Sequence, residues 1–298
     1  MKISSDLFAA SLKCPTKCYL RSTGHAGTGN AYAEWAQAQN DTCRGKATKL
    51  LTLELPKTQV VVAPPAAEDL ESAQWRLALD LPVQAGDIES RIHAVERVPS
   101  KGRKPDQFIP IRFIFTNKLA KDDRLLVAFD ALVLSLLLGR EVSVGKIIHG
   151  DNHATLKVKM PGLVSEADKL IGKITALLAG GSPPDLILNR HCGICEFRDR
   201  CRQEALEQDD LSLLPGMSAK ERQTLRSKGI FTVAQLSYTF RPRRRPKRLR
   251  DKREKYHHSL KALAIREKKI PAMTKTRART QGIWPERMHS FRCAEQHP

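Results

Sequence analysis

Apolar and polar positions alternate with a period of two in some stretches of the chain and follow a helical period in others. The alternation predicts strands at Trp75–Leu81, Ile88–Val98 and Phe108–Thr116, and two further strands at about 143–149 and 154–160. Helical periodicity predicts helices at 31–51, interrupted or ended near Gly45, at 122–138 with Gly139 as a stop, and at 165–178. This order of elements predicts an α/β domain in which helices flank a mixed sheet.

The length and the charge of the chain divide it into three parts. It has 298 residues, and at 41% hydrophobic content it can build a sizeable core. The 51 Lys and Arg residues outnumber the 32 Asp and Glu residues, and from Arg241 onward the count is 19 against 5. We therefore expect a globular domain at 1–205, a short helical module at 206–240 and a basic tail at 241–298, with a polyanion such as nucleic acid as the partner.

Transmembrane and secretory segments are not expected. No apolar run approaches the roughly 18 residues that span a bilayer, and the N-terminus lacks the apolar stretch of a signal peptide. An intracellular, cytoplasmic protein without membrane partners is predicted. Its seven cysteines are an odd number, so a metal or cluster site is favoured over a disulfide framework.

Three cysteines lie close together after the α/β region. Their spacing is Cys192-x2-Cys195-x5-Cys201, and the segment KCPTKCYL offers a distant fourth thiolate at Cys14 or Cys18. Four thiolates complete the coordination that zinc and iron–sulfur sites require, and the spacing alone does not choose between the two. The alternatives are buried cysteines without a metal, and His191 as a nitrogen ligand in place of a bystander.

The cysteine segments resemble those of the iron–sulfur nuclease group within the RecB-like, PD-(D/E)XK superfamily. The resemblance implies a restriction-endonuclease-like core and a [4Fe–4S] cluster on Cys14, Cys192, Cys195 and Cys201, with Cys18 as the fallback for Cys14. The chain is most similar to bacterial RecB-like nucleases that continue into a ribonuclease-H-like domain, through segments such as FIPIRFIF, LLVAFDALVLS, CEFRDRCRQ and KYHHSLKALAIREKKI. The likeness covers about residues 1–270 and implies action on single- or double-stranded DNA in repair or processing, with a helicase or that domain as a partner.

The catalytic pattern of the superfamily is incomplete in this chain. The superfamily has an Asp on its second strand and an Asp/Glu-x-Lys on its third, which hold Mg²⁺ or Mn²⁺ and orient water for hydrolysis. Here His93 stands at the first position, with only Asp87, Glu89 and Glu96 as nearby carboxylates, and Pro110-Ile111-Arg112 stands at the second. An Arg is a poor activator of water because it keeps its proton.

The resemblance implies metal-dependent phosphodiester hydrolysis of DNA, which the incomplete pattern can leave weak or lost, with His93, Glu96 and Arg112 as the candidate participants. The alternatives are a non-catalytic nucleic-acid-binding remnant and a zinc-ribbon-like binding module. Four further polar residues are candidates, although solvated strand ends or a hydrogen-bonded core group explain them more simply: Asp130, His149, Asp151 and His153.

Two features after the cysteines indicate nucleic-acid binding. Residues 211–236 resemble half of a helix-hairpin-helix unit, with turns at Leu214-Pro215-Gly216 and Lys228-Gly229-Ile230 and Thr232 as an N-cap; a plain helical connector is the alternative. The expected phosphate contacts are Arg241, Arg243, Arg244, Arg245, Lys247 and Arg248. Aromatic residues are only 5% of the chain, so no base-stacking platform is predicted.

The end of the sequence departs from the resemblance. After Ile270 the family continues into the ribonuclease-H-like domain, whereas residues 271–298 show no clear period. We expect an irregular tail, produced by truncation or a shifted reading frame, in which Cys293 has no role.

Overall fold

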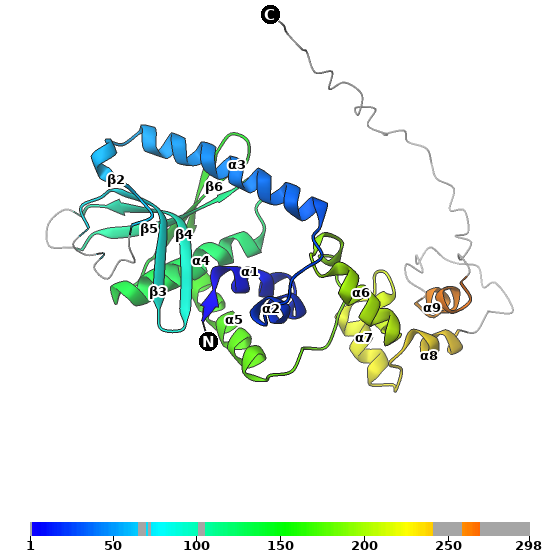
Figure 1. Cartoon of the computed structure of the whole chain (residues 1–298). Coiled ribbons are helices and arrows are strands. Elements are labelled where there is room, and N and C mark those ends of the chain that lie inside the picture. The colour runs from blue at the N-terminus through cyan, green and yellow to red at the C-terminus, as the bar shows by residue number, and fades with distance from the viewer. Residues whose placement is uncertain (1, 65–69, 71–72, 101–104, 241–257, 269–298) are drawn as a thin grey trace, which may run out of the picture. The chain divides into compact units, whose positions relative to one another are not determined.

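A computed structural model describes residues 2–64, 70, 73–100, 105–240 and 258–268 of the chain (Figure 1). The chain divides into two compact units, Met1–Leu213 and Leu214–Pro298. The predicted phosphate contacts Arg241, Arg243, Arg244, Arg245, Lys247 and Arg248 lie outside the described residues.

The first unit is built on one mixed, open sheet flanked by helices, as the order of the elements predicted. Its described strands are β1 Ile3–Ser4, β2 Val60–Val62, β3 Leu77–Ala85, β4 Ile88–Val98, β5 Gln107–Ile114, β6 Val144–His149 and β7 Ala154–Lys159. They follow the order β2-β3-β4-β5-β6-β7, and β1 pairs with β4. The pairs β1–β4, β2–β3 and β5–β6 are parallel, whereas β3–β4, β4–β5 and β6–β7 are antiparallel.

Helices cover the two faces of this sheet (Figure 1). They are α1 Ser5–Lys13, α2 Pro15–Ser22, α3 Ala31–Leu53, α4 Lys121–Leu138 and α5 Pro161–Ala179. α4 buries Val127 and Phe129 on one face, where Phe8 of α1 stacks on Phe129 with ring centroids 4.7 Å apart. α3 packs on the other face, where its Ala47 meets Ile111 and Phe113.

The approach of α4 to the sheet requires a glycine in β6. A Cβ atom at Gly145 would lie 2.5 Å from Cγ1 of Val127, which is closer than packed carbon atoms come. The absence of a side chain there lets the almost wholly apolar helix α4 lie directly on the strand. Gly139, at φ +63°, ends α4 in the left-handed conformation as predicted.

At one residue of β3 the alternation of side chains between the two sheet faces is interrupted. Asp80 adopts a φ of +53°, and the residues on either side of it belong to different cores: Leu79 packs on the α3 side and Leu81 on the α4 side. In a regular strand these two side chains would share a face. The Asp80 carboxylate forms an ion pair with Arg44 of α3, which holds this irregular position.

The long helix α3 departs from its prediction. It runs without a break from Ala31 to Leu53, so the expected interruption near Gly45 is wrong. Gly45 costs helix stability, but its neighbours Cys43 and Ala47 are buried against the sheet and keep the helix continuous.

Helices also follow α5 in the first unit. The short turn η2 spans Cys192–Ile194, α6 spans Arg198–Glu207 and η3 spans Leu211–Leu213. Phe197, Cys201 and Ala205 form a small core with Leu20 and Leu186. The segment that carries the cysteines therefore packs on α2.

The described helices of the second unit are short. They are α7 Ala219–Arg226, α8 Val233–Tyr238 and α9 His258–Arg266. Thr232 caps α8 as predicted, because its Oγ1 accepts from the Gln235 N–H at 3.1 Å while the Gln235 side chain accepts from the Thr232 N–H. α9 packs on α8, and the Arg266 guanidinium lies 4.4 Å from the Tyr238 ring centroid. Within the described ranges no helix has both the length and the apolar character to cross a bilayer.

Candidate metal centre

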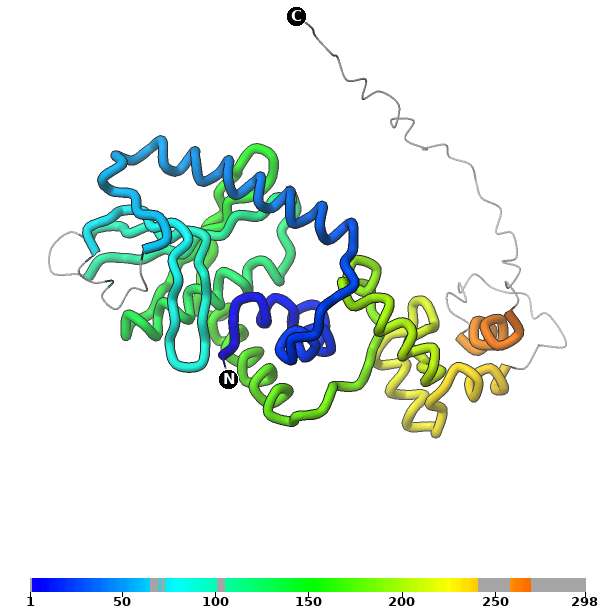
Figure 2. Tube along the Cα trace, viewed as in Figure 1, coloured from blue at the N-terminus to red at the C-terminus, as the bar shows by residue number. Residues whose placement is uncertain are grey.

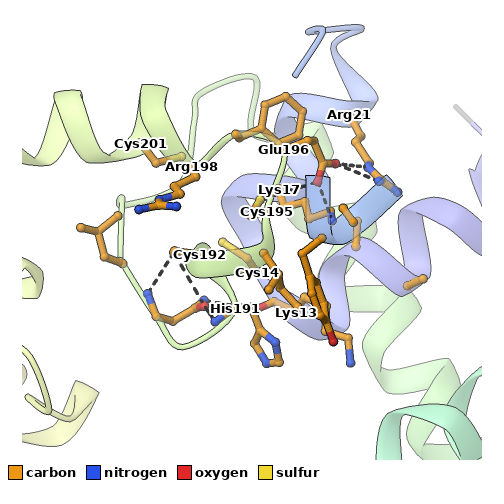
Figure 3. A pocket seen from close by; sticks show the side chains of 18 of the residues that line it. Lys13, Cys14, Lys17, Arg21, His191, Cys192, Cys195, Glu196, Arg198 and Cys201 are labelled. Carbon is orange, nitrogen blue, oxygen red and sulfur yellow. Dashed lines mark hydrogen bonds and ion pairs between the residues drawn. The ribbon is translucent and has the colours of Figure 1, made fainter. Parts of the chain in front are cut away.

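Four cysteines from distant parts of the sequence line one cavity in the first unit. The cavity has a volume of about 460 Å³. Cys14 contributes from the junction between α1 and α2, Cys192 and Cys195 from the loop that contains η2, and Cys201 from α6 (Figure 3). All four positions that the resemblance selected therefore line the same cavity.

The two early cysteines have different surroundings. Cys14 is half-buried at the N-cap of α2, where Pro15 begins the helix. Cys18 lies one helical turn further on, is fully buried, and belongs to the hydrophobic core rather than to the cavity wall. Cys14 is therefore the early thiol that reaches the cavity.

Asn189 organises the loop that carries Cys192. The Asn189 N–H donates to the Cys192 sulfur at 3.2 Å, and its side-chain oxygen accepts from the His191 N–H at 2.8 Å. Its side-chain amide donates to the carbonyl of Lys13 at 3.2 Å. One side chain thus shapes the cysteine turn and ties it to the residue that precedes Cys14.

Glu196 provides a second tie between the loop and the N-terminal helices. Its carboxylate lies 2.8 Å from Lys17 Nζ and 2.8 Å from Arg21 Nε, and its carbonyl accepts from the Thr28 N–H at 3.0 Å. Burial opposes ionisation of Glu196, but the Lys17 hydrogen bond, a backbone N–H and the two positive charges outweigh it and lower its pKa to about 2.

The chain next to Thr28 runs beside the chain at Glu196 (Figure 2). A Cβ atom at Gly27 would lie 2.6 Å from Cβ of Glu196. A glycine at this position is what allows the two segments to touch. These contacts are made by protein atoms alone, so the cysteine loop is held against α1 and α2 by the polypeptide itself.

The surroundings of three of the cavity thiols favour their neutral form in the absence of a cation. Burial raises the pKa of Cys192 and Cys195, and burial together with the neighbouring thiols raises that of Cys201 to about 11. A positively charged metal group would reverse this tendency, because thiolates bind it directly. His191 also lines the cavity, and burial together with Lys13 lowers its pKa, so the ring is kept neutral.

The spacing of these donors is wider than a single ion requires. Across the described part of the chain, no group of three His, Cys, Asp or Glu side chains is close enough to hold one metal ion.

The candidate catalytic residues lie on the sheet, and each one already has a protein partner. His93 of β4 is half-buried, its Nδ1 accepts from the Phe113 N–H at 3.2 Å, and burial with the nearby Arg112 and Arg44 charges holds its pKa well below 6.5. Arg112 of β5 forms a two-point ion pair with Asp130. Glu96 forms an ion pair with Lys146 of β6.

His93 and Arg112 are neighbours, because Ala94 pairs with Ile111 in the β4–β5 register. Glu96 lies further along β4, opposite Leu77 and Ile109. Asp87 and Glu89 lie at the far end of the β3–β4 hairpin, where Glu89 pairs with Gln84 and lies 3.8 Å from Lys2. Asp130, one of the further candidates from the sequence, is ion-paired with Arg112, and Asp80, which the sequence analysis missed, is ion-paired with Arg44.

The polar residues at the end of β6 form a turn. Asp151 accepts from the Asn117 side chain at 3.0 Å and its N–H donates back to Asn117 at 3.2 Å. The His153 ring contacts the Gly150 carbonyl at 3.1 Å. The simpler interpretation, a hydrogen-bonded strand end, accounts for these contacts.

Comparisons with known proteins identify no family. No family model matches the chain, and no curated protein matches it. A solved structure described as "Crystal structure of SSO0001" has 15% sequence identity over 68% of this chain and 86% of that chain, with a TM-score of 0.35. A likeness of that size identifies neither the fold nor the function.

Proposed function

We propose that this protein is a RecB-like iron–sulfur protein that binds DNA through a nuclease-type fold and has lost the hydrolytic chemistry of that fold. The observation that carries the proposal is the meeting of Cys14, Cys192, Cys195 and Cys201 at one cavity. Two cysteine segments almost 180 residues apart in sequence supply thiols to the same small volume. A structural metal group explains this convergence, because it would bind both segments at once.

We propose a [4Fe–4S] cluster in place of a zinc ion because the resemblance implies one. Structural zinc needs four ligands at the corners of one tight tetrahedron. The described donors include no three that suit a single ion. When bound, such a cluster supplies four iron atoms for four thiolates, and it can also carry an electron.

Cations around the cavity support an anionic occupant. Lys13, Lys17, Arg21 and Arg198 line it, against the single carboxylate of Glu196. A cluster with four thiolate ligands carries net negative charge, so nearby cations stabilise it. The Asn189 N–H bond to the Cys192 sulfur would act in the same direction, because hydrogen bonds to ligand sulfurs help set the reduction potential.

DNA binding is favoured over DNA hydrolysis because the carboxylates of this part of the sheet already form ion pairs with basic side chains. The superfamily's hydrolysis needs two carboxylates that are available to Mg²⁺ or Mn²⁺. Here Asp80 is held by Arg44, Asp130 by Arg112 and Glu96 by Lys146. Each pair cancels a charge that a metal ion would need, so we expect no hydrolysis at this position.

DNA is the proposed partner because the chain carries 51 basic against 32 acidic residues. Contacts to phosphate give sequence-independent affinity that falls steeply with salt. The basic residues from Arg241 to Arg248 remain a predicted contact that lies outside the described residues.

Metal analysis of the anaerobically purified protein tests the proposal. We expect about four iron and four sulfide per chain and a brown colour. Cys14→Ala and Cys201→Ala should lose the iron, whereas Cys18→Ala should keep it, because Cys18 faces the core. A colourless protein with one zinc would support the zinc-ribbon alternative, and a metal-free protein would overturn the proposal.

Incubation of labelled single- and double-stranded DNA with Mg²⁺ or Mn²⁺ tests the loss of hydrolysis. We expect binding without degradation. Degradation that disappears in Glu96→Gln would refute the assignment of this site as inactive.

A further inference from the structure

Three aromatic rings gather at the exposed start of α3. Tyr32 and Trp35 are 51% and 50% exposed, and their ring centroids lie 5.6 Å apart. Trp35 also meets Phe115, which follows β5, in an edge-to-face contact at 5.8 Å. The low aromatic content of the chain gave no reason to expect such a platform, which the fold assembles from two distant segments.

The platform is fixed in place at the edge of the cysteine cavity. Asn30 caps α3 by accepting from the N–H groups of Tyr32 and Ala33, and its side-chain amide donates to the carbonyl of Gly193 at 3.4 Å. Tyr32 itself lines the cavity. The rings are thus presented on an anchored helix end, which lowers the entropy lost when a ligand stacks on them.

Two lysines lie further along α3, on the same side of the helix as Trp35. Lys46 and Lys49 follow Trp35 by 11 and 14 residues, and at 3.6 residues per turn both lie within about 40° of it around the helix axis. Both are exposed, and neither has an ion pair with another described residue. The acidic residues of α3, Glu34 and Asp41, lie about 100° and 120° from Trp35 around the helix axis, and about 60° and 80° from Lys49.

We propose that the exposed face of α3, defined by Tyr32, Trp35, Lys46 and Lys49, binds single-stranded DNA. Bases stack on the two rings, and phosphates further along the strand contact the two lysines, which lie about 16–21 Å from Trp35 along the helix. A duplex presents no base faces along its length, so the rings select the single strand. The exposed Leu50 and Leu53 would suit a protein partner, but the lysines and the net charge of +19 favour a polyanion.

The inference rests on the proposed function for its partner class, and a binding assay with the full chain tests it. Fluorescence anisotropy with a labelled strand of about 16 thymidines reports the affinity. Trp35→Ala should weaken binding by about 5- to 100-fold, whereas Trp35→Phe should retain most of the affinity. Trp75→Phe is the matched control, because Trp75 packs on Phe108 within the fold.

Salt dependence tests the lysines separately. The double variant Lys46→Gln/Lys49→Gln should reduce the slope of log affinity against log salt by about 1.4, which is the loss of two contacts on a single strand. Lys169→Gln/Lys173→Gln removes the same charge from exposed positions on α5 and should leave the slope unchanged.

The outcomes separate the two proposals. Wild-type protein that contains the cluster and binds the strand, but whose α3 variants bind equally well, overturns this inference alone. Wild-type protein that does not bind single-stranded or duplex DNA at any salt concentration overturns both. Far-UV circular dichroism of each variant confirms that a lost affinity is not lost folding, and binding by the folded Trp35→Phe variant as weak as that of Trp35→Ala would also contradict stacking.

Discussion

The buried ion pair between Arg112 and Asp130 should be among the most sensitive points of the fold. Arg112 Nε lies 2.5 Å from Asp130 Oδ2, and Arg112 Nη2 lies 2.8 Å from Oδ1. Ser90 Oγ also donates to Oδ1 at 2.6 Å. Asp130 is fully buried and Arg112 is 9% exposed, so little water screens the pair.

Removal of one partner leaves the other charge buried and unpaired. We expect Asp130→Ala to lower the free energy of unfolding by about 3–5 kcal/mol, and Arg112→Met to lower it by a similar amount. Added together, these losses would approach the whole stability of an ordinary domain. The double variant removes both charges and leaves mainly a small cavity, so it should cost about as much as one single variant or less, with a coupling energy of about 3 kcal/mol or more.

Urea unfolding followed by tryptophan fluorescence measures these changes, because Trp35 and Trp75 both lie in the first unit. All four proteins are compared at the same metal content and with a common slope against urea. A loss below about 1 kcal/mol in Asp130→Ala, or a double variant that costs the full sum, would refute the argument. Either result would mean that Arg112 is free of its partner in solution and available to a substrate.

Two further predictions concern His93 and Gly27. The folded state holds the pKa of His93 below 6.5, so the unfolded chain takes up the proton first and the free energy of unfolding falls as the pH drops below 6.5. His93→Asn keeps an acceptor for the Phe113 N–H. In urea titrations at several pH values, this variant should reduce the slope of the free energy of unfolding against pH by about 1.4 kcal/mol per pH unit. Gly27→Ala forces a Cβ atom against Glu196, so it should lower the free energy of unfolding by about 1–3 kcal/mol and also lower the iron content. In Gly45→Ala the added Cβ meets no atom within 4 Å, so this variant should raise the free energy of unfolding by about 0.5–1 kcal/mol in the same assay. A His93→Asn variant with the wild-type slope, or a Gly27→Ala variant as stable and iron-rich as wild type, would contradict these expectations.

The longer elements of the fold were predictable because their patterns are strong. β4 matches its predicted range, and α4 begins one residue earlier than predicted and ends at the expected glycine. The pattern of apolar and polar residues did not predict the short elements and irregular positions, where tertiary contacts decide the local structure. α1 and α2 were missed because they are short and separated only by Cys14, and the reversal of faces at Asp80 has no signature in residue type.

Three of the four cysteines that line the cavity stand out in the sequence by their spacing, and the resemblance added Cys14, but the residues that hold their loop in place were not predicted. Asn189 and Glu196 act through single hydrogen bonds and ion pairs to partners about 175 residues away. Their residue types are common, and nothing in the local sequence distinguishes them from solvated polar residues. The aromatic platform was missed for the same reason, since Phe115 joins Trp35 only after the chain has folded.

The distribution of charge explains why DNA contacts are expected away from the cysteines. Three of the four cations at the cavity already have a carboxylate partner: Lys13 pairs with Asp122, and Lys17 and Arg21 pair with Glu196. Four thiolates would add negative charge to that volume and engage these cations further. The proposed DNA partner would therefore place its phosphates against basic residues that have no carboxylate partner. Lys46 and Lys49 on α3 meet that condition in the described chain, and they lie on the same face as the exposed ring of Trp35, on which bases can stack.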